Sequence, residues 1–475
     1  MNPPGAIADV RAPRLSTPLA VLAGVAAVVT LVALSMPLVR PAPSYDPWSW
    51  LLWGRELAHA ALDTREGPAF KPLPVGLTAL LAPTGSLAPV IWVGLVRVSA
   101  LVTLFLSFSL GRRLAGGSWM NGIASRPAEP DASRTAGVLA AAGVALCGAF
   151  LGTAAAGAET PLLLALGLAA AEAWRRERWG IVIACALGCA LLRVEAWPFV
   201  ALAGVLLWRR APRLRPALVG AGALVPLAWI VPELIGSGEP FRSAGRARMP
   251  NPGQPALADV PAFAALGEAL RLPLWPLWAG VAILAVDARR TRDWTPLVPA
   301  AAGAVWILIV AVMAQLGFSG EPRYSLAGAV LVSISGAVGL AGGAYARDRR
   351  WLLGLALALL AVAAVPRLAD VADLRERQAY QWALAADLEN GIRASGGREA
   401  VLACGRPYVG PLRGPLTAYK LDVRKRVVEP DDPPRAPGFV FRSKLTEDDP
   451  AQPAIPAGFE PVARNAHWQI ARSCS

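Results

Sequence analysis

An aspartate followed by a proline opens a tryptophan-rich stretch and could do acid–base chemistry. Residues 44–60 read SYDPWSWLLWGRELAHA. Asp at an N-cap with Pro directly after it is a helix-start signal, so we expect Asp46 to cap a helix. Trp50, Trp53 and Leu57 then share one face, which predicts an amphipathic helix lying at a membrane interface. Asp46 could accept a proton from a hydroxyl group, or it could only cap the helix while the tryptophans only anchor it.

Two further segments place single charges near the starts of apolar runs. FKPLP contains Lys71, and GAETPL contains Glu159. A lysine at a membrane surface could bind a phosphate group, or it could simply extend its ammonium group toward water. A glutamate near a helix start is also an ordinary helix opening. Lys71 and Glu159 are candidate substrate-binding residues, and so is Glu56 on the first helix.

Charges also interrupt apolar sequence in two other places. LRVEAWPF carries Arg193 and Glu195, and GFSGEPRY carries Arg323 and Tyr324. Charges inside an apolar run are costly to desolvate, so they satisfy one another or bind a ligand. Arginine can offer two parallel donors to a phosphate. These four residues are candidates for substrate binding, with a structural ion pair and interfacial anchoring as the alternatives.

The elements that must position these residues are membrane helices. The 475-residue chain is 55% hydrophobic and 17% charged, with a mean hydropathy of +0.46. Apolar runs near the roughly 20 residues needed to cross a bilayer recur along it, which predicts a polytopic α-helical membrane protein with about eleven spans. The spans are expected near 18–39, 86–110, 135–155, 159–174, 179–192, 196–208, 216–235, 273–287, 295–316, 326–346 and 351–366.

Arginine clusters predict the orientation of these spans. The formal charge is +13, and arginines gather near 112–134, 175–178, 209–215, 289–292 and 347–350. Such clusters in short loops mark the cytoplasmic side, so the charge does not indicate a nucleic-acid partner. Residues 1–17, with Arg11 and Arg14, are expected in the cytoplasm, before a first run too long for a cleaved signal. An odd number of spans then places the C-terminus outside a plasma membrane.

Residues 368–475 are more polar and predict a small extracytoplasmic α/β domain. A helix is expected over 368–394, with strands near 399–404, 424–429, 438–444 and 467–474. Cys404 ends the first strand and Cys474 nearly ends the chain, and an outside location permits a disulfide between them. The predicted organisation is a cytoplasmic segment (1–17), a transmembrane domain (18–367) with a first outer loop over 40–85, and the outer domain.

Some kinds of site have little support in this sequence. The chain has two histidines, His59 and His467, which lie far apart in the sequence. They argue against a histidine metal centre or a serine–histidine triad. The cysteines form no CxxC motif. Neither a Walker nor a Rossmann glycine pattern occurs in a strand–helix context, which argues against a cytoplasmic nucleotide site.

Taken together, these motifs resemble the GT-C superfamily of membrane glycosyltransferases, such as protein O-mannosyltransferase-like enzymes and actinobacterial arabinofuranosyltransferases. The shared features are an acidic first outer loop, GAETPL, an R-x-E segment and a late R-Y segment. By order and topology the resemblance covers most of residues 18–366. It implies a polyprenyl-phosphate-linked sugar as donor, and transfer on the outer side of the membrane to a glycan, lipid or protein of the cell envelope, a step of cell-wall biogenesis.

The resemblance also implies residue roles. Asp46 matches the first-loop aspartate and is the expected general base, while Glu159, Arg193 with Glu195, and Arg323 match the later motifs. Lys71, Arg193 and Arg323 are the cations expected to face the leaving phosphate. Many relatives carry two adjacent acids in the first loop, whereas Tyr45 precedes the aspartate here. A divalent cation would therefore lack one of its expected ligands.

Two other classes of protein remain open from the sequence alone. A transporter or lipid flippase would also have many spans, but it favours inverted repeats and charges near mid-membrane. No clear internal repeat is visible here, and the acids fall on the outer side. A non-catalytic scaffold or sensor, with the outer domain binding a partner, is the third class.

Overall fold

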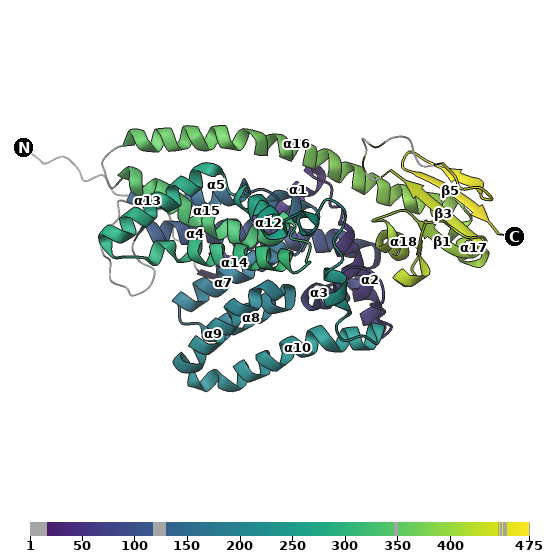
Figure 1. Cartoon of the computed structure of the whole chain (residues 1–475), viewed down its shortest axis with the longest axis horizontal. Helices are drawn as coiled ribbons and strands as arrows, with labels where there is room; N and C mark the ends of the chain where they lie inside the picture. Colours follow the sequence, from purple (N-terminus) through teal and green to yellow (C-terminus); the bar gives the residue numbers. More distant parts are fainter. Residues whose placement is uncertain are drawn as a thin grey trace, which may run out of the picture.

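The computed structural model describes residues 17–116, 130–345, 350–444, 446, 449 and 454–474. A bundle of helices is joined by one long helix to a small sheet domain (Figure 1). The first helices are α1 (Thr17–Leu38), α2 (Tyr45–Ala58), α3 (Pro72–Leu81), α4 (Ala88–Ala115), α5 (Pro130–Ala145), α6 (Phe150–Ala155), α7 (Thr160–Arg175), α8 (Trp179–Leu192) and α9 (Trp197–Arg210). The next are α10 (Arg215–Ser237), α11 (Arg242–Ala247), α12 (Pro261–Leu270), α13 (Trp275–Thr291), α14 (Val298–Gln315), α15 (Pro322–Tyr345) and α16 (Arg350–Ala394).

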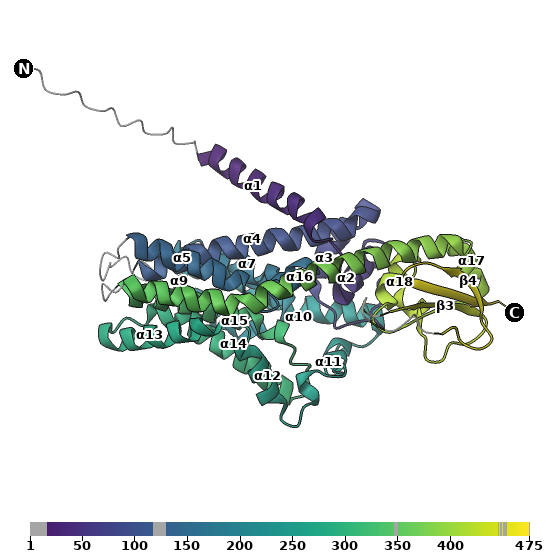
Figure 2. The ribbon, with the colours of Figure 1, turned by 90° about the horizontal axis from the view of Figure 1, so that it is seen from above.

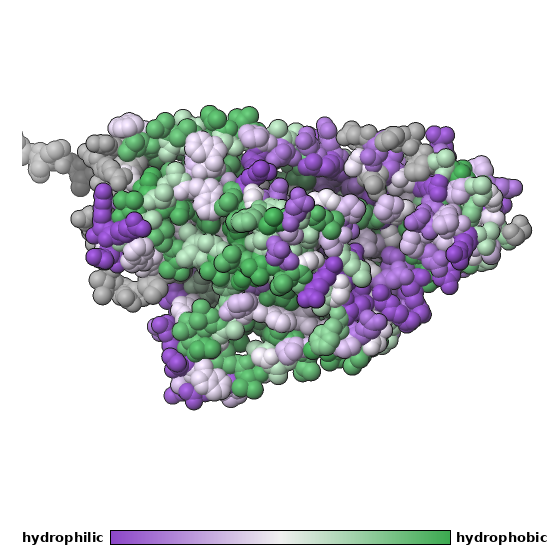
Figure 3. Space-filling model, viewed as in Figure 1, coloured by the Kyte–Doolittle hydropathy of each residue, from purple (hydrophilic) through white to green (hydrophobic). Residues whose placement is uncertain are grey.

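The helical part is that of a multi-pass membrane protein. Helices occur at every predicted span, and six in the described ranges are long and apolar enough to cross a bilayer alone. A seventh span results if α12 and α13, bent by 90°, are counted as one. The predicted span over 135–155 is split into α5 and α6, and α7 to α9 are shorter than a bilayer. Apolar surface covers the helices between two more polar ends (Figure 3).

Arginines at helix ends distinguish one end of the bundle from the other. Arginine pairs lie in the last turns of α4, α9 and α13, and Arg175 lies in the last turn of α7. These turns gather at the end away from the sheet domain (Figure 1). This common end agrees with the sequence-based assignment of one side. The predicted cytoplasmic segment 1–17, with Arg11 and Arg14, lies outside the described residues except for Thr17, which opens α1. Arg126, Arg347 and Arg349 also lie outside them.

Close glycine contacts hold α15 at the centre of the bundle, where it packs against α5, α13 and α14. A Cβ on Gly280 of α13 would lie 2.0 Å from the carbonyl oxygen of Gly336 on α15. A Cβ on Gly328 would likewise lie 2.5 Å from the carbonyl oxygen of Gly303 on α14. No side chain fits such distances, so glycine allows these backbones to touch. The beginning of α15, which carries Arg323, is fixed by this packing.

The C-terminal domain continues directly from α16. This 45-residue helix runs through Pro366 without ending, so the predicted span 351–366 and the predicted helix 368–394 form one element. The remaining elements are α17 (Gly397–Cys404), β1 (Arg406–Val409), α18 (Gly414–Lys420), β2 (Glu429–Pro430), β3 (Gly438–Ser443), β4 (Glu460–Arg464) and β5 (Trp468–Ser473). The sheet has the order β2-β1-β3-β5-β4, with β1 parallel to both neighbours and the other pairs antiparallel.

Two of the four predicted strands are confirmed, namely β3 and β5. The prediction over 399–404 was wrong, because GREAVLAC consists largely of good helix formers and forms α17. The prediction over 424–429 was also wrong: Lys425–Val427 form a 3-10 turn, and β2 is only two residues long. The missed strand, β4, contains Pro461 beside a register shift, and an edge strand tolerates both features. A disulfide joins Cys404 to Cys474.

The tryptophan face of the helix over 45–58 was predicted to face the membrane interface, but it is buried in the protein. Trp50 and Trp53 are almost completely buried, whereas Leu57, expected on the same face, is 41% exposed. Trp50 packs edge-on against Trp92 of α4, and Trp53 against Phe70, at centroid distances of 5.8 and 5.7 Å. The face that seemed suited to lipid is therefore part of the protein core.

The sheet domain docks on this first outer loop. Trp48 of α2 packs on Tyr419 of α18, and one hydrophobic cluster runs from α2 into the sheet. Three ion pairs cross the contact: Arg55 with Asp422 at 2.8 Å, Arg426 with Asp63 at 2.9 Å, and Lys425 with Glu66 at 2.8 Å. The loop is thus held between the helical bundle and the sheet domain.

Candidate active site

Seven of the eight predicted functional residues outside the disulfide come together at one end of the bundle. Their positions follow from helix ends: Asp46 in the first turn of α2, Lys71 before α3, Glu159 before α7, Arg193 after α8, Glu195 in the turn before α9, and Arg323 with Tyr324 opening α15. A helix end leaves polar backbone groups unpaired, which suits a polar site. The end they share is the one next to the sheet domain (Figure 2).

Glu159 lies at the centre of the cluster and is completely buried. Its Oε1 contacts the Lys71 ammonium and lies 2.6 Å from Arg193 Nη2. Gly157, two residues earlier, adopts a positive φ of 71° and accepts a 2.9 Å hydrogen bond from the Trp92 indole, so the chain turns tightly into α7. A buried carboxylate between two cations satisfies the charge of both.

Arg193 sits where the chain leaves α8 in an extended conformation, and it is 4% exposed. Its Nη1 lies 3.3 Å from Glu195 Oε1, and its guanidinium lies 4.2 Å from the centroid of the Tyr324 ring. The predicted charged break between two short helices is therefore buried in protein, as a membrane requires. Arg193 Nη2 and Glu159 Oε2 are buried without a well-aligned hydrogen-bond partner in the described part of the chain. Such unsatisfied groups are rare in proteins and are suited to receive a ligand.

Arg323 connects the base candidate to this cluster. Its Nη1 donates to Asp46 Oδ2 at 3.1 Å, its Nε lies 2.5 Å from Glu321 Oε2, and its Nη2 lies 3.3 Å from the Tyr324 hydroxyl. The prediction that Asp46 caps α2 was wrong. Ser44 is the N-cap, Asp46 lies in the first turn of the helix, and its carboxylate faces Arg323 of α15.

The donor set does not suit a divalent cation. Asp46 and Glu321 both face Arg323, so a guanidinium already occupies the position between the two carboxylates. Within the described ranges, no three His, Cys, Asp or Glu side chains gather into a possible metal site. A metal of the Mg²⁺ or Ca²⁺ type needs several oxygen ligands converging on one point.

Some residues of the cluster were not predicted. These residues are Glu321, which pairs with Arg323, and Gln254, whose amide contacts Glu321. The position of Glu321 two residues before Arg323 was the available signal. Nothing in the sequence indicated Gln254, because it lies 67 residues away on an irregular loop.

Glu56 is the one predicted residue that stands apart. It lies ten residues after Asp46 on α2, a separation of about 15 Å along the helix. Its Oε2 accepts a 2.9 Å hydrogen bond from the Asp63 amide, and its Oε1 is buried without a partner in the described chain. Burial raises the pKa of Glu56 from an ordinary 4.5 to about 7. This environment indicates a structural residue rather than a partner of Asp46.

The free energy of unfolding should depend on pH because Glu56 is buried. Between pH 4.5 and 7 the unfolded chain loses the Glu56 proton while the folded chain keeps it, so stability falls as the pH rises. Glu56→Gln keeps a hydrogen-bond acceptor without the charge, and we expect it to exceed the wild type in unfolding free energy at pH 8 by up to about 3 kcal/mol, and much less at pH 5. Denaturant unfolding in detergent at both pH values measures this. The exposed Glu399→Gln is the matched control, and an equal gain at both pH values would contradict the burial argument.

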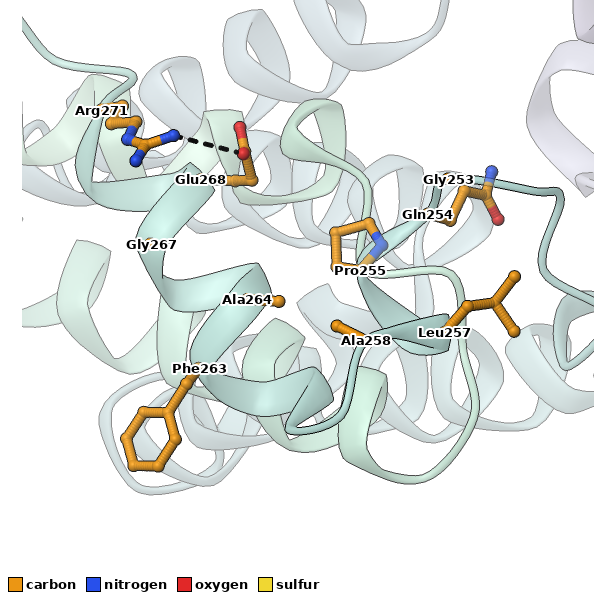
Figure 4. Close-up of a pocket in the computed structure, with 10 residues that line it drawn as sticks. All are labelled: Gly253, Gln254, Pro255, Leu257, Ala258, Phe263, Ala264, Gly267, Glu268 and Arg271. Atoms are coloured by element: carbon orange, nitrogen blue, oxygen red, sulfur yellow. Dashed lines mark ion pairs between the residues drawn. The ribbon is translucent and has the colours of Figure 1, made fainter.

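A cavity of about 550 Å³ opens beside the cluster. It is lined by the loop over 253–258 and by one side of α12, and an ion pair of 3.6 Å between Glu268 and Arg271 lies at its edge (Figure 4). Gln254 belongs both to this lining and to the charged cluster through Glu321. The volume is within the range of ordinary ligand sites.

No protein-family model matches the chain, and no curated protein matches its sequence. Its structure is similar to the crystal structure of ArnT from Cupriavidus metallidurans bound to undecaprenyl phosphate. The TM-score is 0.54 at 15% identity, and the match covers 96% of this chain and 98% of that one. The chain therefore shares the fold of this protein along almost its whole length.

Proposed function

We propose that the protein is a glycosyltransferase that moves a sugar from a polyprenyl-phosphate donor to a cell-envelope acceptor on the outer side of the membrane. The observation that carries this proposal is the cluster itself. A partly exposed carboxylate, Asp46, pairs with Arg323, and the Tyr324 ring connects Arg323 to the Lys71–Glu159–Arg193 group. The fold is shared with a solved protein bound to undecaprenyl phosphate. The arginine-rich ends of α4, α7, α9 and α13 lie opposite this cluster, which supports placing them in the cytoplasm and the cluster outside.

The proposed reaction is a single displacement. The acceptor hydroxyl oxygen attacks the anomeric carbon of the sugar, the bond from that carbon to the phosphate oxygen breaks, and the polyprenyl phosphate leaves with the bonding electrons. Asp46 takes the hydroxyl proton as the new bond forms. The configuration at the anomeric carbon is inverted, because attack and departure occur on opposite faces.

We assign the stabilisation of the leaving phosphate to three cations. Lys71 and Arg193 meet at Glu159, and Arg323 joins them through the Tyr324 ring, which contacts both arginines. Preorganised charges in a site of low dielectric constant stabilise developing negative charge strongly. Arg193 Nη2 pairs with Glu159 at 2.6 Å without a well-aligned hydrogen bond, and it is the donor that we assign to a phosphate oxygen.

Purified protein in lipid nanodiscs tests this function directly. Radiolabelled polyprenyl-phosphate sugars, both hexoses and pentoses, are offered one at a time with a cell-envelope extract. We expect one donor to give time-dependent transfer with release of polyprenyl phosphate, and undecaprenyl phosphate to inhibit it as a product. Folded protein that neither transfers from any donor nor binds undecaprenyl phosphate would contradict the proposal and favour a transporter or a scaffold.

A further inference from the structure

A second buried hydrogen-bond network is centred on Glu233, near the end of α10. This carboxylate is completely buried. Arg242 Nε lies 2.9 Å from its Oε2, the Thr64 hydroxyl donates to the same oxygen at 3.1 Å, and the Ser243 hydroxyl donates to Oε1. Both oxygens are thus occupied, and the network joins α10 and α11 to the first outer loop.

The network ends on the backbone directly before Lys71. Arg242 Nη2 donates to the carbonyl oxygen of Pro68 at 2.8 Å, and the amide of Phe70 donates to Ser243 Oγ at 2.6 Å. Lys71 follows in an extended conformation as the N-cap of α3, and its ammonium extends over the Trp50 ring to Glu159. The position of the lysine therefore depends on two backbone groups that the Glu233 network holds.

A purely structural contact would not need this arrangement. A buried ion pair stabilises a fold no better than apolar packing of the same volume, whereas hydrogen bonds fix geometry. The close approach of α10 adds to this, because a Cβ on Gly236 would lie 2.8 Å from Thr64 Oγ1. The end of α10 is fitted to the loop at van der Waals contact, so displacement of either one moves the other.

We propose that Glu233 is a positioning residue: acting through Arg242 and Ser243, it holds the 68–70 backbone so that Lys71 meets the phosphate of the donor. The inference rests on the proposed function, since it assigns Lys71 to the donor phosphate. Glu233 itself touches neither Lys71 nor the cluster around Glu159 in the described contacts.

Two variants and one control test the proposal. Glu233→Gln removes the charge that holds Arg242. Ser243→Ala keeps that charge but removes the hydroxyl that accepts from the Phe70 amide and donates to Glu233. Glu239→Gln changes an exposed acid on the following turn of the chain and is the matched control. Hydrogen exchange over residues 64–71 is measured together with KM for the donor, kcat, and binding of undecaprenyl phosphate.

Both variants should exchange faster over 64–71 and raise KM roughly tenfold, with kcat changed less than twofold, whereas the control should match the wild type. If Glu233→Gln fails to fold, Ser243→Ala decides alone. Unchanged exchange, or faster exchange with an unchanged KM, would overturn the positioning role and leave the proposed function standing. A wild type without transfer or binding would overturn the proposed function and this inference with it.

Discussion

Replacing Asp46 with asparagine should lower the transfer rate at least ~100-fold, the usual contribution of a positioned general base. Asparagine has the same shape and still offers an oxygen to Arg323, which now lies 3.1 Å from the carboxylate, so the fold should remain intact. It cannot take the acceptor proton. The loss should therefore appear in kcat while undecaprenyl phosphate binds as in the wild type.

The control for this experiment is Asp259→Asn, which alters an exposed aspartate in the loop before α12. We expect its activity to equal that of the wild type. Asp46→Glu should retain some transfer, because it restores a carboxylate at a displaced position. If Asp46→Asn keeps wild-type kcat in a folded protein, Asp46 is a structural partner of Arg323 and another group accepts the proton.

Glu159→Ala should destabilise the protein by about 3–5 kcal/mol, the usual cost of removing one partner from a buried ion pair. Lys71 and Arg193 would be left as neighbouring buried cations without the carboxylate that both contact. Glu159→Gln should be milder, because its amide oxygen can still accept a hydrogen bond from either cation. Thermal unfolding in detergent measures the loss, and transfer should disappear in the alanine variant even below its unfolding temperature.

Glu268→Ala provides the comparison for Glu159→Ala. Its carboxylate is 45% exposed and pairs with Arg271 at 3.6 Å, and such surface pairs contribute about 1 kcal/mol or less. Equal losses in the two variants would show that Glu159 is solvated in solution. In that case the cluster would not be the preorganised site that the mechanism needs.

The sequence was most informative where local chemistry decides the structure. Charges inside apolar runs marked Arg193, Glu195 and Arg323, and hydropathy located helices at every predicted span. Roles for Asp46 and Lys71 stay predictions, although both side chains lie in the cluster. The residues could be selected because a charge near a membrane helix needs a partner or a ligand wherever the chain folds.

The sequence did not show which side chains of the cluster contact one another. Lys71 contacts Glu159 across 88 positions, and Arg323 reaches Asp46 across 277. The tryptophans of α2 fit an interfacial helix by periodicity alone, but α18 and α4 cover them, a contact that only the tertiary fold creates. The Glu233 network was missed for the same reason, since its partners come from the first loop and from α11.

Because α16 is unbroken, the number of residues in it sets the orientation of the sheet domain relative to the bundle. The helix is 45 residues long, roughly 68 Å, and it crosses from the bundle to the sheet without a hinge. Each residue inserted into or deleted from such a helix turns its far end by about 100° and moves it by about 1.5 Å. One deletion would turn Asp422 and Arg426 away from Arg55 and Asp63, whereas the loss of two whole turns would nearly restore their angle but leave the domain short of the loop. Length changes in this linker should therefore be tolerated far less than those in an ordinary flexible tether between domains.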